Sequence, residues 1–283
     1  MSKQVPVDPA AKAAEQVEHG VHRIAHDLAY QRLGIVNCVF YGPAGAGDRN
    51  WVLIDAGIPG SAPLIQDAAA GLFGAEARPA AIVLTHGHFD HIGALGELAA
   101  QWQVPIYAHP DEHPYLNGQS AYPPPDPTVG GGLMSTLAPL YPRGPIDVSP
   151  FLQPLPIDGS VPHMPGWQWI ATPGHSPGHI ALWHPAGRTL IAGDAVITTR
   201  QESAFAVALQ SPELHGPPMY YTPDWPSARA SAQRLAALAP DLLVSGHGPA
   251  MQGEAMRAAL DTLARDFDQV AVPKHGRYVG QRG

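Results

Sequence analysis

Short apolar runs alternate with longer amphipathic stretches along most of this chain. Runs bounded by Gly, Pro or Asp and rich in Val, Ile and Leu predict strands, and apolar positions at helical spacing predict helices. The predicted strands are Val21–Ile24, Ile35–Tyr41, Trp51–Ile54, Ala81–Leu84, Val104–Ala108, Trp167–Ala171, Ile180–Trp183, Thr189–Ala192, Ile197–Ala206 and Leu242–Val244. The predicted helices are Ser61–Phe73, Ile92–Gln101, Pro226–Leu238 and Glu254–Asp266, with a hairpin turn at Gly42–Asp48.

This order predicts an α/β protein in which each half of the chain supplies several strands and then helices. We interpret residues 19–283 as a single domain and the polar, Ala-rich residues 1–18 as a flexible lead-in. Fifteen of the 32 prolines fall in residues 105–165, among few periodic segments. Because this interval also carries aromatic and aliphatic residues, we interpret it as an insertion folded over a substrate pocket; a surface excursion without substrate contact is the alternative.

Composition narrows the class of function. A formal net charge of −8 with only 16 Lys and Arg disfavours nucleic-acid binding, which needs a basic face. The single cysteine, Cys38, excludes a disulfide framework and reads as a buried strand residue. No apolar segment marks a signal peptide or a membrane span, so we expect a cytoplasmic protein that acts on a small molecule.

A cluster of potential metal ligands follows the strand Ala81–Leu84. The sequence Thr85-His86-Gly87-His88-Phe89-Asp90-His91 contains three imidazoles and a carboxylate within six residues. Imidazole and carboxylate are the usual ligands of zinc and similar divalent ions. A His-rich solvated turn would not be expected in so apolar a context, and the cluster therefore predicts a metal site.

Three later segments each end in another potential ligand. His175 lies on a Pro-Gly turn, Asp194 ends the strand Thr189–Ala192 with Gly193, and His247 follows the strand Leu242–Val244. An α/β scaffold builds its sites in this way, from side chains at the carboxyl ends of strands. His179, four residues after His175, is expected to be structural.

Together these motifs resemble the metallo-β-lactamase-fold hydrolases, whose signature is H-x-H-x-D-H followed by a distant His, an Asp and a last His. The resemblance extends from about Val21 to Asp266. It implies a four-layer αβ/βα sandwich, with two mixed sheets face to face and helices outside. It also implies two divalent ions, zinc first, with manganese or iron as alternatives. The ligands of one ion would be His86, His88 and His175; those of the other would be Asp90, His91 and His247, with Asp194 bridging the two.

The resemblance also suggests roles around the ions. A metal-bridging hydroxide would be the nucleophile, oriented by Asp90 or Asp194. Asp55, at the end of Trp51–Ile54, would hold a ligand histidine from behind, because a metal-bound imidazole needs its other nitrogen fixed. Tyr220 or Tyr221 would assist the substrate carbonyl, the alternative being two packed aromatic residues.

An aspartate, Asp194, is present at the bridging position, and no signal peptide is visible. Both features favour the glyoxalase-II and lactonase branch over true β-lactamases. We expect a hydrolase of lactones, esters or thioesters, a lactonase first. Only some 36 residues follow His247, which leaves little room for the helical domain of a glyoxalase II. A glyoxalase-II-like thioesterase, a mononuclear-iron persulfide dioxygenase-like oxidoreductase and a non-catalytic binding module remain as alternatives. The proline-rich interval could equally serve a homodimer interface.

Overall fold

The computed structural model describes residues 5–130, 132–205 and 212–280. The chain divides into two compact units. Unit 2 comprises residues 14–122 and 143–168, and unit 1 comprises residues 1–13, 123–142 and 169–283. The proline-rich interval is therefore split, because residues 123–142 belong to unit 1 and both flanking parts belong to unit 2.

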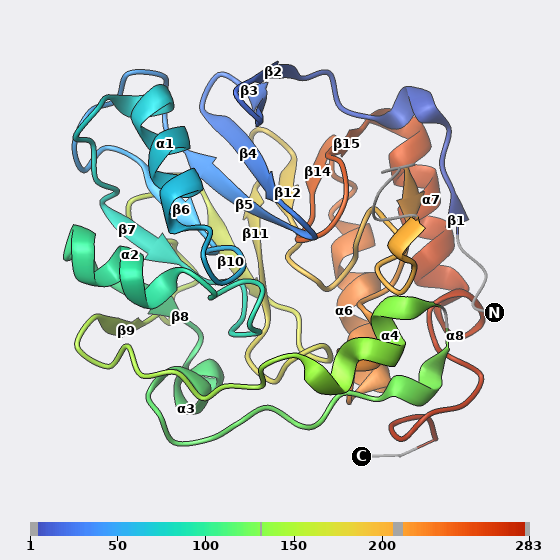
Figure 1. Cartoon of the computed structure of the whole chain (residues 1–283). Helices are drawn as coiled ribbons and strands as arrows, with labels where there is room; N and C mark the ends of the chain where they lie inside the picture. The colour runs from blue at the N-terminus through green and yellow to red at the C-terminus, as the bar shows by residue number, and fades with distance from the viewer. Residues whose placement is uncertain (1–4, 131, 206–211, 281–283) are drawn as a thin grey trace. The chain divides into compact units, whose positions relative to one another are not determined.

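Unit 2 is built on an eight-stranded mixed sheet with the strand order β2 to β9 (Figure 1). Its strands are β2 (Gln16–Glu18), β3 (Val21–Ala25), β4 (Leu28–Leu33), β5 (Val36–Tyr41), β6 (Val52–Ile54), β7 (Ala81–Val83), β8 (Ile106–Ala108) and β9 (Leu152–Pro154). The strands from β2 to β6 pair antiparallel, and those from β6 to β9 pair parallel. The predicted hairpin between Ile35–Tyr41 and Trp51–Ile54 is confirmed by the antiparallel pairing of β5 with β6.

Two helices of unit 2 share the core of this sheet: α1 (Ala62–Phe73) and α2 (Leu95–Trp102). The buried residues of α1 include Ile65, Ala68, Ala69 and Leu72, a spacing that puts them on one face. A third helix, α3 (His113–Leu116), and the turn η2 (Pro110–Glu112) follow β8. The central strands β6 and β7 are buried at every position, which is why they are apolar throughout rather than alternating.

Unit 1 contains a five-stranded mixed sheet in the order β10, β11, β12, β14, β15. The bounds are β10 (Gln168–Ala171), β11 (Ile180–His184), β12 (Thr189–Ile191), β14 (Leu242–Val244) and β15 (Met251–Gln252). The helices α6 (Trp225–Ala237) and α7 (Gly253–Arg265) pack against each other (Figure 1), and α8 (Phe267–Val270) follows. The remaining elements are η1 (Pro9–Ala11), η3 (Pro127–Val129), α4 (Leu133–Leu137), η4 (Ala138–Leu140) and η5 (Met219–Tyr221).

Within the predicted lead-in, residues 1–18, β1 (Val5–Pro6) pairs with β13 (Glu213–Leu214) and Ala11 and Ala13 are buried, whereas β2 is exposed at all three positions. One strand prediction differs from the structure. The predicted strand Ile197–Ala206 was wrong over its described residues. Only Ile197 makes a bridge, to His215, and the chain then turns, with the Ser203 amide donating to the Arg200 carbonyl. The β-branched residues at the start of this segment favour an extended strand, but polar residues follow them. Ala206 lies outside the described residues.

Several elements have no counterpart in the sequence prediction, among them β4 and β9. β4 was missed because Gln31 and Arg32 break the apolar run of an otherwise buried strand. β9 was missed because it is a three-residue edge strand with two exposed positions. Among the described residues, no helix is long and apolar enough to cross a bilayer.

Candidate metal-binding clusters in the two units

The four ligand candidates of unit 2 lie in one turn directly after β7. His86, His88, Asp90 and His91 are all buried, and the rings of His86 and His91 lie 4.1 Å apart, centre to centre. The turn closes on itself, because the amides of His91 and Ile92 donate to the His88 carbonyl. Four side chains with lone pairs or negative charge are thus buried together, an arrangement that burial alone would disfavour.

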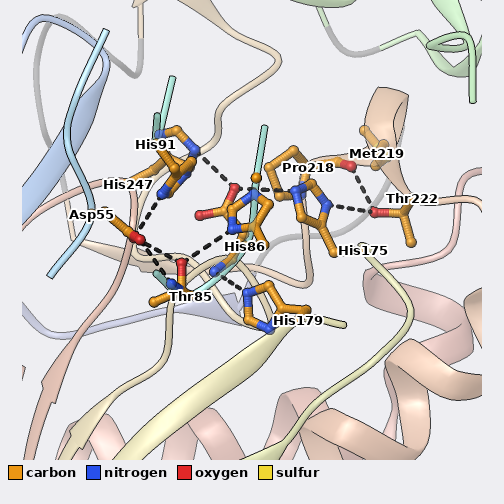
Figure 2. A network of polar contacts seen from close by, with 12 residues as sticks. Asp55, Thr85, His86, His91, His175, His179, Pro218, Met219, Thr222 and His247 are labelled. Atoms are coloured by element: carbon orange, nitrogen blue, oxygen red, sulfur yellow. Dashed lines mark hydrogen bonds and ion pairs between the residues drawn. The ribbon is translucent and has the colours of Figure 1, made fainter. Parts of the chain in front are cut away.

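Asp55 holds this turn from the neighbouring strand. β6 and β7 run parallel with Ile54 opposite Val83, so Asp55 and Thr85 emerge at the same edge. The Asp55 carboxylate accepts hydrogen bonds from the Thr85 amide (2.8 Å) and the Thr85 hydroxyl (2.7 Å), and it lies 2.8 Å from His91 Nδ1 (Figure 2). Asp55 is buried with a φ of +60°, a conformation that costs energy for a residue other than glycine. The structure thus places Asp55 against His91; its support of a metal ligand stays a prediction.

These contacts determine which nitrogen of each ring is basic. Asp55 accepts from Thr85 and faces His91 Nδ1, so the neutral His91 ring that donates to this acceptor carries its proton on Nδ1 and its lone pair on Nε2. The Thr85 hydroxyl donates to Asp55, and its oxygen therefore accepts from His86 Nδ1 at 3.1 Å. His86 Nε2 is then basic as well. Fixing Nδ1 in this way is how proteins prepare an imidazole to bind a metal through Nε2.

A buried acid and a tyrosine hold the His86–Gly87 peptide. The Gly87 amide donates to Glu112 Oε2 (2.9 Å) and to the Tyr122 hydroxyl (3.0 Å), and Tyr122 in turn donates to Glu112. The Tyr122 ring lies 4.4 Å from the His88 ring. Burial and the adjacent Glu112 carboxylate raise the pKa of Tyr122 well above its usual range, so Tyr122 remains a donor.

In unit 1 the ligand candidates come from three separate segments. Asp194 follows β12 and His247 follows β14, each three residues after strands that run parallel with Ile191 opposite Val244. The Gly246 amide donates to the Gly193 carbonyl (2.8 Å), which ties the two loops together. As a result His247 Nε2 lies 3.0 Å from Asp194 Oδ2.

His175 reaches the same carboxylate from a turn packed on α6. Its Nε2 lies 3.4 Å from Asp194 Oδ2. The preceding Gly174 has a φ of +132°, and a Cβ there would come within 2.3 Å of the Ala228 amide nitrogen, so only glycine allows this approach. The Thr222 hydroxyl donates to the Pro218 carbonyl (2.8 Å), and its oxygen faces His175 Nδ1 at 3.4 Å (Figure 2).

This geometry also makes His175 Nε2 the basic nitrogen of its ring. A basic nitrogen and a carboxylate oxygen that face each other repel unless a positive charge lies between them. A proton or a metal ion would satisfy the pair, and neutral imidazole with carboxylate is the donor set that divalent ions prefer. The side chains of unit 1 therefore fit a metal ion.

His179 has the structural position that the sequence predicted. Its Nε2 accepts from the Asp194 amide (2.9 Å), and its Nδ1 donates to Thr172 Oγ1 (2.8 Å). Both nitrogens are thereby used within the protein. His179 holds the backbone of Asp194 rather than a ligand of its own.

Tyr220 and Tyr221 are buried in η5, directly before Thr222. The Tyr220 carbonyl accepts from the Asp126 amide (2.8 Å), and the Met219 amide donates to Glu202 Oε1 (2.8 Å). The two tyrosines are therefore close in sequence to a contact of His175. Their predicted catalytic role remains a proposal.

Sequence reasoning missed three polar residues that contact these clusters, Glu112, Tyr122 and Thr222, and a fourth, Glu202, that contacts the segment before Thr222. Glu112 alone had a usable signal, because it follows the predicted strand Val104–Ala108 at the edge where Asp55 and Thr85 emerge. The other three lie in irregular segments, where no pattern marks a position.

Comparison with known proteins agrees with this arrangement. The model of the Metallo-beta-lactamase superfamily matches residues 32–247. A probable metallo-hydrolase of Bacillus subtilis strain 168, YflN, is 45% identical over 258 residues, which cover 91% of this chain and 95% of that protein. A hydroxyacylglutathione hydrolase of Bdellovibrio bacteriovorus is 32% identical over 119 residues, 41% of this chain and 34% of that protein.

Solved structures show the same fold. TTHA1623, crystallised in a di-iron-bound form, is 27% identical with a TM-score of 0.54, over 83% of this chain and 96% of that one. The Rm3 metallo-beta-lactamase is 21% identical with a TM-score of 0.59, over 93% and 96% of the two chains. These matches, with the two mixed sheets and their helices, confirm the predicted metallo-β-lactamase fold. Relatives named metallo-hydrolases support a metal-dependent hydrolase.

Proposed function

Since this chain belongs to the metallo-β-lactamase superfamily, we propose that it is a dinuclear hydrolase in which the clusters of both units hold two divalent ions. The proposed ligands are His86, His88 and His175 for one ion and Asp90, His91 and His247 for the other, with Asp194 bridging. The observation that carries the proposal is the orientation of the imidazoles. His86, His91 and His175 each have Nδ1 directed at an oxygen, the arrangement in which an imidazole binds metal through the lone pair of Nε2.

Two bound ions would polarise a substrate carbonyl and lower the pKa of a water toward neutrality. The chain's own contribution is orientation. Asp55 and Thr85 fix His91 and His86, and the sheet register of β12 and β14 sets Asp194 beside His247. Asp90 or Asp194 would accept the proton of the attacking water, because a carboxylate close to cations stays ionised.

We propose a lactone, ester or thioester as substrate, with a lactone first. A hydroxyl from Tyr220 or Tyr221 would hydrogen-bond the substrate carbonyl, supported by their position directly before Thr222. Zinc is the first choice of metal, and His and Asp ligands suit manganese and iron as well. The thioester class has separate support from the relative named hydroxyacylglutathione hydrolase.

Residues 123–142 would contribute to substrate binding. Within unit 1 this segment lies against η5, where the Asp126 amide donates to the Tyr220 carbonyl. It also exposes Leu133, Leu137 and Leu140. Replacing these three leucines by serine should change kcat/KM across a lactone and ester panel. Conversion of a wild-type dimer to monomers with unchanged kinetics would instead assign the segment to a homodimer interface.

The test of the proposal is elemental analysis of the purified protein, combined with a hydrolysis screen of acyl-lactones, thioesters, phosphotriesters and β-lactams. We expect about two divalent ions per chain and a lactonase or thioesterase activity that EDTA removes and zinc restores. A single iron per chain with thiol-dependent oxygen uptake would contradict hydrolysis. That result would favour the persulfide dioxygenase-like alternative, in which His86, His88 and His175 hold iron.

A further inference from the structure

Glu112 and Tyr122 lie outside every motif of the family signature, yet they contact its centre. Glu112 is in η2, after β8, and Tyr122 is the last residue before the chain leaves unit 2. Both are buried, with exposed fractions of 1% and 2%. The two side chains meet at one atom of the metal-ligand turn, the amide nitrogen of Gly87.

The Tyr122 hydroxyl and Glu112 leave little room for a side chain at position 87. A Cβ on Gly87 would lie 2.6 Å from the Tyr122 hydroxyl and 3.4 Å from Glu112 Oε2. The hydroxyl thus occupies the place of a side chain, and the backbone of the turn is seated directly on the Glu112–Tyr122 pair. The Tyr122 ring also contacts the His88 ring on one side and stacks on Tyr115 on the other, with a centroid distance of 3.8 Å to Tyr115.

Burying a carboxylate is expensive, and a fold that needed only packing at this position would use an apolar residue. Glu112 is instead directed at the amide of the His86–Gly87 peptide, the first of the two peptides between the Cα atoms of His86 and His88. Rotation of this peptide would move Gly87 relative to His86 and would therefore change the separation of the two imidazoles. Fixing it restrains that separation.

We propose that Glu112 and Tyr122 are positioning residues, which lock the Gly87 peptide and thereby hold His86 and His88 at the separation that a divalent ion requires. The inference rests on the proposed function, since it assumes that these histidines bind metal. It adds two residues that support the ligands through the backbone, whereas Asp55 acts on a ring nitrogen.

Affinity for zinc, measured by competition with a chromophoric chelator, tests this inference. Tyr122→Phe keeps the ring and removes the hydroxyl, and should weaken zinc binding by about tenfold or more, the lower range for loss of an outer contact. Tyr115→Phe is the matched control, because it changes the neighbouring ring of the same stack, and it should keep wild-type affinity. The absorption spectrum of the cobalt-loaded protein should shift in Tyr122→Phe and not in Tyr115→Phe.

A second pair of variants separates positioning from general stability. Glu112→Gln retains an oxygen that can accept from Gly87, so it should bind zinc more tightly than Glu112→Ala. Hydrogen exchange of the metal-free proteins should become faster in peptides covering residues 85–91 in Tyr122→Phe and Glu112→Ala, with exchange in α1 unchanged. Wild-type zinc affinity and wild-type exchange in these two variants would overturn the inference alone. A wild-type protein that binds no divalent ion would overturn the proposed function and the inference together.

Discussion

The two ligand clusters are assembled in different ways. Unit 2 places four candidate ligands in a single turn of six residues after one strand, from His86 to His91. Unit 1 brings three candidate ligands together from segments as far apart as His175 and His247, around the single carboxylate of Asp194. The first cluster is local in sequence, and the second depends on the register of two parallel strands.

The residues that hold the two clusters in place also differ in their arrangement. In unit 2 the contacts converge on one turn, with Asp55 on one side and Glu112 with Tyr122 on the other. In unit 1 each ligand segment has a separate partner. Thr222 faces the His175 ring and His179 holds the Asp194 backbone. Ser245 and Thr198 hold the His247 carbonyl. A cluster formed by one turn needs a firm anchor for that turn, whereas a cluster gathered from distant segments needs one anchor for each.

The largest effect should come from the residue that unit 1 shares between its histidines. Asp194→Ala removes the carboxylate that faces both His175 and His247. Since metal ions supply several kcal/mol of transition-state stabilisation, kcat/KM should fall by roughly a thousandfold. Steady-state kinetics and elemental analysis measure this loss. Glu254→Ala, on the exposed face of α7, is the control, and near-normal activity in Asp194→Ala would remove Asp194 from the site.

A smaller effect is expected from replacing Asp55, which holds the metal-ligand turn of unit 2. Asp55→Asn suits the left-handed backbone of this position, because asparagine adopts it readily, so the variant tests the charge rather than the fold. Loss of the carboxylate behind His91 should weaken zinc binding by about 10- to 100-fold. The measurement is a chelator competition titration. Unchanged affinity would mean that the charge of Asp55 does not contribute to the support of His91.

A smaller effect still is expected from losing the hydrogen bond between the Asp194 amide and His179. His179→Leu leaves the buried Asp194 amide without its acceptor, which should lower the free energy of unfolding by about 1–3 kcal/mol. Chemical denaturation of the metal-free protein measures this change. If the stability stayed the same while zinc affinity collapsed, His179 would be a ligand rather than a support.

The last prediction changes no residue and uses the reactivity of Cys38 to follow unfolding of unit 2. Cys38 is fully buried in β5, and burial raises the pKa of its thiol, so the native protein should react very slowly with a thiol reagent even at pH 8. Reaction should become rapid only when unit 2 unfolds. Comparing labelling with fluorescence across a denaturant series shows whether the two units unfold together. Fast labelling under native conditions would contradict a rigid β5.

The local cluster was predictable and the supports were not. His86, His88, Asp90 and His91 stand out because chemistry and proximity coincide in one short segment. Asp55 could be proposed because it matches a supporting position of the family that the sequence resembles, and the structure puts it against His91 Nδ1. Glu112 follows a predicted strand, but nothing in the sequence marks Tyr122, and the contact of both residues with Gly87 depends on how the chain after β8 folds back.

The predicted helices and strands also differ in how well local sequence determined them. The helix predicted for Ser61–Phe73 matches α1 closely, because its apolar spacing is set by the helix itself. The strand predicted for Ile197–Ala206 failed over its described residues, because strand propensity has no effect without a neighbouring strand to pair with. In its place the chain turns toward Glu202, which accepts a hydrogen bond from the Met219 amide.

The amino-acid sequence by itself determined the kinds of candidate ligand, their order and the α/β class, since these depend on residue chemistry and on periodicity along the chain. Only the tertiary structure decided which nitrogen of His86, His91 and His175 faces an oxygen and which buried groups hold each candidate segment. Those features depend on hydrogen bonds between residues far apart in the chain, such as Tyr122 with Gly87 and Thr222 with His175. Their geometry exists only after the strands have paired.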